Sequence, residues 1–151
     1  MSDVGRRFRS LFVCGSLTVT FVAGAVARSQ DAKPGATAWD GVYTVEQAER
    51  GRALYMDVCA ACHGKDLRGD STAPSLIEES FSFQWDGTTV GELFTRIRMF
   101  MPSDRPNSLS SQRYRDIVAF ILQANKFPAG ERALADEAEI LQQIRITAKR
   151  P

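Results

Sequence analysis

Histidine is almost absent from this chain, and cysteine is scarce. The 151 residues include one histidine, His63, and three cysteines, Cys14, Cys59 and Cys62. Acidic and basic residues nearly balance at a formal net charge of +1, so the composition indicates no basic surface for nucleic acid. Internal repeats are also missing, and the length is typical of one small globular domain with extensions at its ends.

The main hydrophobic run is too short for a typical membrane span. It extends from Leu11 to Val26, about 16 residues where a transmembrane helix needs ~20. Arginines precede it, and Ala25-Val26-Ala27 forms a small-x-small cleavage pattern before a polar stretch. These features predict a signal peptide at residues 1–27, cleaved after Ala27, rather than a retained membrane anchor. We therefore expect an exported, periplasmic protein with no stable membrane span after cleavage.

Cys14 lies inside this predicted signal peptide. It lacks the small preceding residue of a lipoprotein cleavage site and comes before most of the hydrophobic run. The pair Arg6-Arg7 is followed directly by Phe8, which is a poor match to a twin-arginine signal. We expect Cys14 to be removed with the signal peptide, so that Cys59 and Cys62 are the cysteines of the mature chain.

The remaining sequence carries helical patterns and no convincing strand. Two capping boxes mark helix starts, one at Thr44 with Gln47 and one at Thr89 with Glu92. Apolar residues then recur three and four positions apart, as in amphipathic helices. The expected helices begin near Thr44, Thr89, Ser110 and Asp136, and the third ends near Asn125.

These patterns predict a small all-α domain at residues 40–126. A flexible leader is expected at residues 28–39, and a C-terminal arm with one short helix at residues 127–151. A hydrophobic core of this size ordinarily needs additional stabilisation, such as a disulfide or a bound group.

Cys59, Cys62 and His63 form a C-x-x-C-H sequence, the attachment signature of a c-type haem. Two thiols about one helical turn apart can each add to a vinyl group on the same edge of the porphyrin. The adjacent histidine then lies beneath the iron as its proximal ligand. The motif predicts one covalent haem c, with His63 bound to the metal.

Other interpretations of the cysteine pair are possible. A thioredoxin-like dithiol requires a preceding strand and a βαβ context, and neither is visible. A structural zinc site needs about four protein ligands, so this chain would have to add a carboxylate. A plain disulfide is compatible with export.

The second axial ligand must come from a residue other than histidine. The candidates are Met56, Met99 and Met101. Met56 is too close to the motif to reach the opposite haem face. Met101 precedes Pro102, where a helix must stop and the chain becomes extended. We favour Met101 as the second metal ligand and retain Met99 as the alternative; packing into the core is the ordinary role of such methionines.

The sequence resembles a class I cytochrome c domain over residues 44–125. The resemblance is carried by Gly51, Tyr55, the C-x-x-C-H motif, Pro74, Met101-Pro102 and the helix containing Tyr114 and Leu122. It implies a small helical fold wrapped around one haem. It also implies that the first and last helices cross where Gly51 and Tyr55 meet Ile117 and Phe120.

The resemblance also implies roles for residues around the haem. The carbonyl of Pro74 would accept a hydrogen bond from His63, which fixes the ring and raises its basicity. Trp85 would bond a haem propionate, although a plain core position is an equally good interpretation. Arg96 and Arg98 could neutralise propionates, but exposed positions on a helix are the simpler expectation.

Two segments, Tyr43–Gly51 and Asn125–Gly130, resemble cytochromes found beside or fused to bacterial quinoprotein dehydrogenases. We therefore expect a non-enzymatic protein that transfers single electrons between Fe(II) and Fe(III) states. Its partners would be redox proteins, such as a quinoprotein dehydrogenase and a terminal oxidase or other cytochrome. The alternatives are a haem subunit of such a dehydrogenase, docked through the C-terminal arm, or a haem peroxidase or gas sensor with a labile sixth ligand.

Overall fold

A computed structural model describes residues 35–151. The predicted signal peptide, its cleavage site, Cys14 and leader residues 28–34 lie outside the described residues. Along the described chain the elements are η1 (Ala38–Asp40), α1 (Val45–Val58), α2 (Ala60–His63), α3 (Glu78–Trp85), α4 (Val90–Phe100), α5 (Ser111–Ala124) and α6 (Ala138–Leu141).

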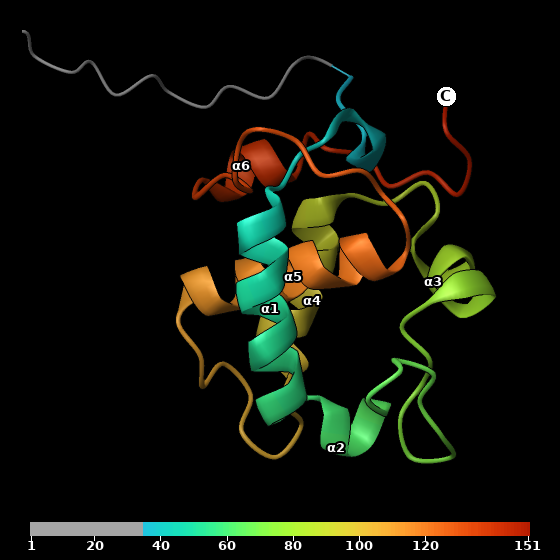
Figure 1. Ribbon diagram of the computed structural model, residues 1–151, viewed down its shortest axis with the longest axis vertical. Coiled ribbons are helices and arrows are strands. Elements are labelled where there is room, and N and C mark those ends of the chain that lie inside the picture. The colour runs from blue at the N-terminus through green and yellow to red at the C-terminus, as the bar shows by residue number, and fades with distance from the viewer. Residues whose placement is uncertain (1–34) are drawn as a thin grey trace, which may run out of the picture.

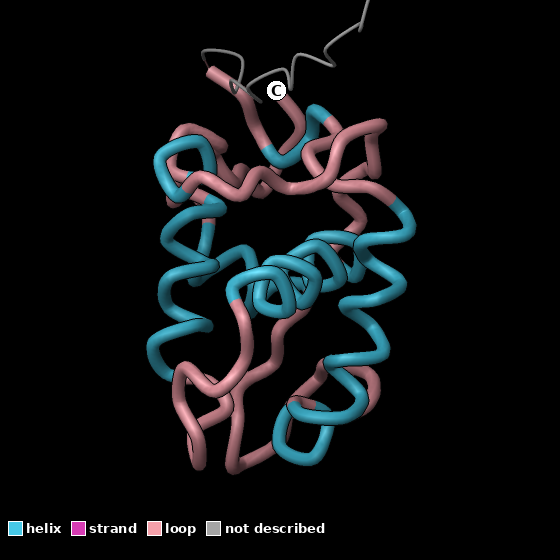
Figure 2. The backbone as a smooth tube through the Cα atoms, turned by 90° about the vertical axis from the view of Figure 1, so that its left-hand side faces the viewer, coloured by secondary structure: helices cyan, strands magenta, loops and turns pink. Residues whose placement is uncertain are grey.

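The described chain is all-α, as predicted. Figure 2 shows helices joined by loops. Pairing of extended backbone within residues 35–151 is limited to isolated bridges that join Thr37 and Thr89 to Arg145. Within the same residues, no helix is both long and apolar enough to cross a membrane.

Helices α1 and α5 cross at a glycine (Figure 1). A Cβ atom on Gly51 would lie 1.7 Å from the carbonyl oxygen of Asp116, so only glycine allows this approach. One turn later, the rings of Tyr55 and Phe120 pack with centroids 5.3 Å apart. The expected crossing is present, but Gly51 meets the backbone of Asp116, whereas the side chain of Ile117 lines a cavity.

The two predicted capping boxes differ in the structure. At α4 both hydrogen bonds form, between the side chains of Thr89 and Glu92 and each other's backbone N–H groups. At α1 the hydroxyl of Thr44 accepts from Gln47 N–H, but the Gln47 amide oxygen accepts from Leu134 N–H at 2.8 Å. The buried Gln47 therefore stabilises a distant segment and does not complete its own cap.

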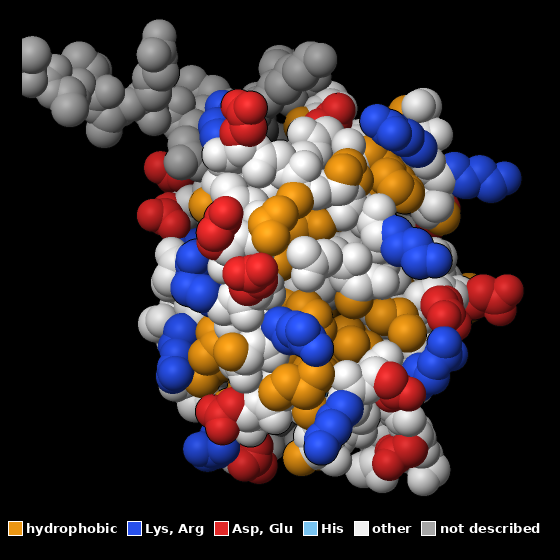
Figure 3. All heavy atoms as spheres, in the orientation of Figure 1, with side chains coloured by type: hydrophobic (Ala, Val, Ile, Leu, Met, Phe, Trp, Pro, Cys, Tyr) orange, Lys and Arg blue, Asp and Glu red, His pale blue; other side chains and the backbone are white. Residues whose placement is uncertain are grey.

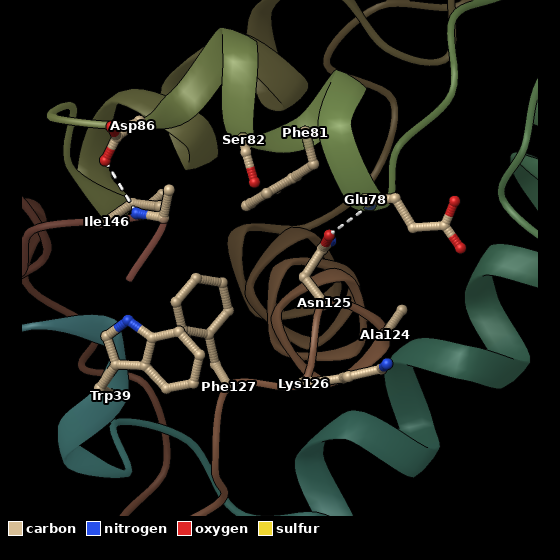
Figure 4. A pocket seen from close by; sticks show the side chains of 11 residues that line it. Trp39, Glu78, Phe81, Ser82, Asp86, Ala124, Asn125, Lys126, Phe127 and Ile146 are labelled. Carbon is tan, nitrogen blue, oxygen red and sulfur yellow. Dashed lines mark hydrogen bonds between the residues drawn. The ribbon is translucent and has the colours of Figure 1, made fainter. Parts of the chain in front are cut away.

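Helix α3 is absent from the sequence prediction because its start depends on a distant residue. Its first residue, Glu78, has a positive φ of 60°. The Glu78 N–H donates to the side chain of Asn125 at the end of α5, 3.1 Å away, as Figure 4 shows. No capping side chain precedes the helix, so local sequence offered little signal.

Both ends of the described chain belong to the core. The C-terminal segment is tied to the start by hydrogen bonds from Ala38 N–H to Arg145 and from Arg145 N–H to Ala36. Asp136 does not cap α6 but forms an ion pair with Arg115 on α5. Side chains buried in this way include Ala36, Ala38, Phe127, Leu134, Leu141, Ile144 and Ile146.

The expected leader and arm are therefore corrected in two respects. Residues 36–39 are packed against the domain, since Trp39 contacts Phe127 at a centroid distance of 4.6 Å and donates to the Thr147 carbonyl. The C-terminal arm uses its apolar side chains within the chain, which leaves them unavailable for docking onto a partner. Figure 4 shows Trp39 and Phe127 side by side in this region.

The surface carries charges of both signs. On the face drawn in Figure 3, acidic and basic side chains are interspersed with small apolar areas. This distribution matches the small net charge of the sequence. Long-range electrostatic steering by a single-sign field is therefore not a feature of that face.

Candidate cofactor-binding site

The main cavity of the described chain has a volume of about 550 Å³. This size falls within the range of cofactor sites, roughly 300–1,000 Å³. Its walls come from the end of α1, from α2, α3, α4 and α5, and from the segments that follow His63 and Phe100. All of the candidate site residues line it, namely Cys59, Cys62, His63, Pro74, Trp85 and Met101.

The C-x-x-C-H motif forms a tight helical turn at one wall of the cavity. Cys59 ends α1, and its carbonyl accepts from the N–H groups of both Cys62 and His63. This turn directs both thiols and the imidazole to the same space. Cys62 is exposed and Cys59 is partly buried, and burial followed by the nearby Cys62 charge raises the pKa of the Cys59 thiol to about 11.

The His63 ring is oriented by a backbone carbonyl. Its Nδ1 lies 2.9 Å from the Pro74 oxygen. A carbonyl only accepts hydrogen bonds, so Nδ1 carries the proton and the Nε2 lone pair is left for a metal. This is the contact that the resemblance implied for Pro74, and such a partner fixes the tautomer and the orientation of the ring.

Gly69 makes the fold of this loop possible. Its N–H donates to the His63 carbonyl at 2.8 Å, and its φ is +64°. A Cβ atom there would lie 2.2 Å from the Ala73 carbonyl oxygen and 2.6 Å from the Pro74 carbonyl carbon. A side chain at position 69 would therefore displace the carbonyl that orients His63.

Met101 lies on another wall of the cavity. It terminates α4, with its N–H bonded to the Ile97 carbonyl. The other two candidates are on the surface, because Met99 is 59% exposed and Met56 is 38% exposed, and neither lines the cavity. Of these three candidates, only Met101 lines the cavity.

A comparison with known protein families assigns this chain to one of them. A family model described as "Cytochrome C oxidase, cbb3-type, subunit III" matches residues 46–121, which is half of the chain. This chain belongs to that cytochrome c family. It is a class I c-type cytochrome.

Among solved structures, a chain in the sulfane dehydrogenase SoxCD from Paracoccus pantotrophus is similar to this cytochrome. The sequence identity is 21%, the match covers 80% of this chain and 68% of that chain, and the TM-score is 0.45. A search of curated proteins found no match.

The residues of the cytochrome cavity fit a haem. The family implies haem c, and the motif places two thiols and a metal-binding nitrogen at one wall. Apolar side chains supply the rest of the lining, which suits a macrocycle with an apolar face. They include Leu76, Phe81, Leu93, Ile97, Ile117 and Ile121.

The other interpretations of the cysteine pair lack support in the structure. Among residues 35–151, no cluster of three or more His, Cys, Asp or Glu side chains is placed to hold a metal ion, so a zinc site finds no ligand set there. The motif follows a helix, α1, and not the strand that a thioredoxin-like site requires. Cys59 and Cys62 are free thiols.

The charged residues at the cavity are only partly those expected. Arg96 lines the cavity, with its guanidinium 5.9 Å from the centre of the Phe100 ring. Arg98 does not line it and instead donates to the Asn107 side chain at 2.9 Å. Arg105 also lines the cavity, although sequence reasoning overlooked it. The one sequence feature that could have indicated Arg105 is its position four residues after Met101.

Trp85 and Tyr114 illustrate what the sequence could and could not indicate. Trp85 is buried at the C-terminal end of α3 and lines the cavity, so both its expected roles are compatible with its position. Tyr114 was noted only as part of an amphipathic helix. Its hydroxyl donates to the Met101 carbonyl, 2.7 Å away, a contact that no sequence spacing indicates.

Proposed function

We propose that this cytochrome is an exported one-electron carrier with a single haem c in the main cavity. Cys59 and Cys62 would form the thioether bonds, and His63 and Met101 would be the axial ligands. The observation that carries this proposal is the arrangement of the motif and Met101 around one cavity of about 550 Å³. When bound, the haem supplies the Fe(II)/Fe(III) couple.

The protein's own contribution is to hold and tune the site. The Pro74 carbonyl fixes the His63 ring through the 2.9 Å contact with Nδ1. A histidine and methionine ligand pair favours a high reduction potential. The apolar lining further disfavours the more highly charged ferric state, because charge is costly in a poorly solvated cavity. Cys62 is exposed, so one edge of the site is accessible to a redox partner.

Ligation can be tested by the near-infrared sulfur-to-iron band of the ferric protein. The band should be present in the unmodified protein and lost in Met101→Ala. Met99→Ala is the matched control, since Met99 is two residues away on the surface and should leave the band unchanged. Loss of the band in Met99→Ala alone would contradict the assignment.

The covalent attachment has its own test. A pyridine haemochrome assay should give one haem per chain, and the spectrum should shift in Cys59→Ala and in Cys62→Ala as one thioether bond is lost. The mature N-terminus, determined by mass spectrometry, should begin at Arg28 if export removes residues 1–27. A stoichiometry other than one haem per chain would contradict the proposal.

We also propose that the electron donor is a separate periplasmic dehydrogenase of the quinoprotein type, with a terminal oxidase or another cytochrome as acceptor. The support is the resemblance of residues 43–51 and 125–130, which lie together here: Gly130 N–H donates to the Tyr43 carbonyl at 2.7 Å. Purification from periplasmic and membrane fractions should recover such a partner. Co-purification with a permanent complex would favour the dehydrogenase-subunit alternative.

A peroxidase or gas sensor would require a displaceable sixth ligand. Rapid binding of carbon monoxide by the untreated ferrous protein would favour that function. Slow binding, limited by release of Met101, is the result expected for an electron carrier.

A further inference from the structure

Three buried tyrosines donate hydroxyl hydrogen bonds to backbone carbonyls. Tyr43 donates to Phe127 at 2.5 Å, Tyr55 to Gly64 at 2.7 Å and Tyr114 to Met101 at 2.7 Å. Each tyrosine is at most 1% exposed. These bonds differ in what they hold. Only the Tyr114 bond ends on a residue assigned as an axial ligand, and the Tyr55 bond ends next to His63.

Tyr114 contacts both ends of the segment that carries Met101. Its hydroxyl donates to the Met101 carbonyl and accepts from Leu109 N–H at 3.4 Å. The residues between these contacts, 103–108, are exposed. The ring itself is fixed in α5, the helix that crosses α1 at Gly51. One hydroxyl thus connects a solvent-facing segment to a buried helix of the core.

The other hydrogen bonds of this segment are on the surface. Within it, Arg105 N–H donates to the Pro102 carbonyl, and Asn107 N–H donates to the Arg98 carbonyl. The side chains of Arg98 and Asn107 add a further exposed bond. Exposed hydrogen bonds contribute little to order because water competes for the same groups. The Met101 backbone itself is held at two points, by its own N–H on the Ile97 carbonyl at 2.8 Å and by the partly buried Tyr114 bond on its carbonyl. Of these two bonds, only the Tyr114 bond can be removed by a side-chain substitution.

We propose that Tyr114 is a positioning residue that holds Met101 on the iron and thereby sets how readily the sixth ligand is released. The inference rests on the proposed axial role of Met101. Tyr114 acts on the Met101 backbone and does not touch the iron. Loss of one partly buried hydrogen bond changes an equilibrium roughly two- to tenfold, which is the effect expected on Met101 release.

The test uses the ferric haem-loaded protein and imidazole as an external ligand. At saturating imidazole the rate of capture is limited by dissociation of Met101. In Tyr114→Phe, which keeps the ring and removes the hydroxyl, this rate should rise roughly two- to tenfold. The near-infrared sulfur band should weaken in parallel.

The structure supplies matched controls. Tyr43→Phe removes a buried hydroxyl bond at a residue that does not line the cavity, and it should not raise the capture rate. Met101→Ala and the double variant Met101→Ala/Tyr114→Phe should capture imidazole equally fast, since no methionine remains to be held. A general structural effect of Tyr114 would accelerate the double variant as well.

The outcomes separate this inference from the proposed function. If the unmodified protein shows no sulfur band, the ligand assignment and this inference are both overturned. If the band is present but Tyr114→Phe captures imidazole at the rate of Tyr43→Phe, only the role of Tyr114 is overturned. If Tyr114→Phe fails to load haem while Tyr43→Phe loads normally, the Met101→Ala/Tyr114→Phe double variant is compared with Met101→Ala. Failure of the double variant to load haem would show that Tyr114 has a structural role, and it would overturn the inference.

Discussion

The two walls of the cavity are held in different ways. The His63 wall, residues 63–76, is folded onto itself by several backbone hydrogen bonds, including those from Gly69 to His63, Asp70 to Ala73 and Leu76 to Leu67. The Met101 wall, residues 101–109, continues from α4 through the bond of Met101 N–H to Ile97, has exposed backbone bonds beyond it, and has one partly buried side-chain anchor, Tyr114. The first wall is therefore stabilised locally, whereas the second depends on a helix formed later in the sequence.

This difference has a functional consequence. His63, the proposed proximal ligand, ends α2 and is followed by a loop with redundant hydrogen bonds, so losing one bond leaves the others. Met101, the proposed sixth ligand, has a single side-chain anchor, so a single substitution can adjust how it is held. Regions with few buried contacts are those that open most easily. Substitutions at the α1–α5 crossing, which supports both walls, should therefore have different effects from substitutions in one wall alone. A change of pH should act on the His63 wall.

The largest effect is expected when the α1–α5 crossing, which supports both walls, is changed. Gly51→Leu would drive a side chain into the Asp116 carbonyl, which is 1.7 Å from the position of a Cβ atom. We expect haem-loaded protein to be lost almost entirely, as measured by haem content per chain. Ala53→Leu, which places the same side chain on the exposed face of α1, should leave haem content near normal. Similar damage by both variants would mean that the crossing is not the critical contact.

A change in the His63 wall should be the next largest. Gly69→Ala combines left-handed backbone with a clash 2.2 Å from the Ala73 oxygen, whereas Gly87→Ala has φ +78° and nothing within 4 Å. Backbone strain alone costs roughly 1–2 kcal/mol, so Gly87→Ala should lose about that much unfolding free energy. Gly69→Ala should lose more and should also shift the reduction potential of the haem-loaded protein, because the orientation of His63 changes. Equal losses would show that strain, and not the clash, controls this loop.

Acid should loosen the His63 wall through Asp70. Its carboxylate accepts hydrogen bonds from the N–H groups of Thr72 and Ala73, which lowers its pKa below the ordinary 3.8. A lowered folded-state pKa stabilises the protein above the unfolded value, and this stability is lost as pH falls through the folded value. Asp70→Asn should thus be less stable than the unmodified protein near pH 7 and equally stable at the acid end.

Denaturant unfolding across the acid range checks this expectation. Glu49→Gln, an exposed change on α1, serves as the control for the loss of one carboxylate. A constant difference between Asp70→Asn and the unmodified protein at all pH values would rule out the hydrogen-bonded carboxylate as the cause.

The smallest effect is expected from an exposed bond of the Met101 wall. Arg98→Ala removes the 2.9 Å bond to the Asn107 side chain but leaves the Tyr114 anchor intact. Because the bond is solvent-exposed, imidazole capture by the ferric protein should change by less than about threefold. Arg52→Ala on α1 is the matched surface control. A larger change in Arg98→Ala than in Tyr114→Phe would reverse the proposed order of importance on this wall.

Much of the helical domain could be predicted because its signals are local. A capping box needs residues only three apart, so Thr89 and Glu92 were sufficient to predict the start of α4. The same reasoning misjudged Gln47, whose amide is bonded to Leu134, 87 positions away. It also missed α3, whose first N–H depends on Asn125. Each failure involves a polar group whose partner is brought close only by folding.

The sequence by itself determined the chemistry of this cytochrome. Two cysteines and the sole histidine are adjacent along the chain, so their common position at one wall needs little more than a helical turn. Tertiary structure alone decided how the proposed ligands are held: the Pro74 carbonyl on His63, the α1–α5 crossing at Gly51, and the Tyr114 hydroxyl on the Met101 carbonyl. The physical reason is that backbone carbonyls carry no sequence identity, and only the folded chain selects which one a buried donor reaches.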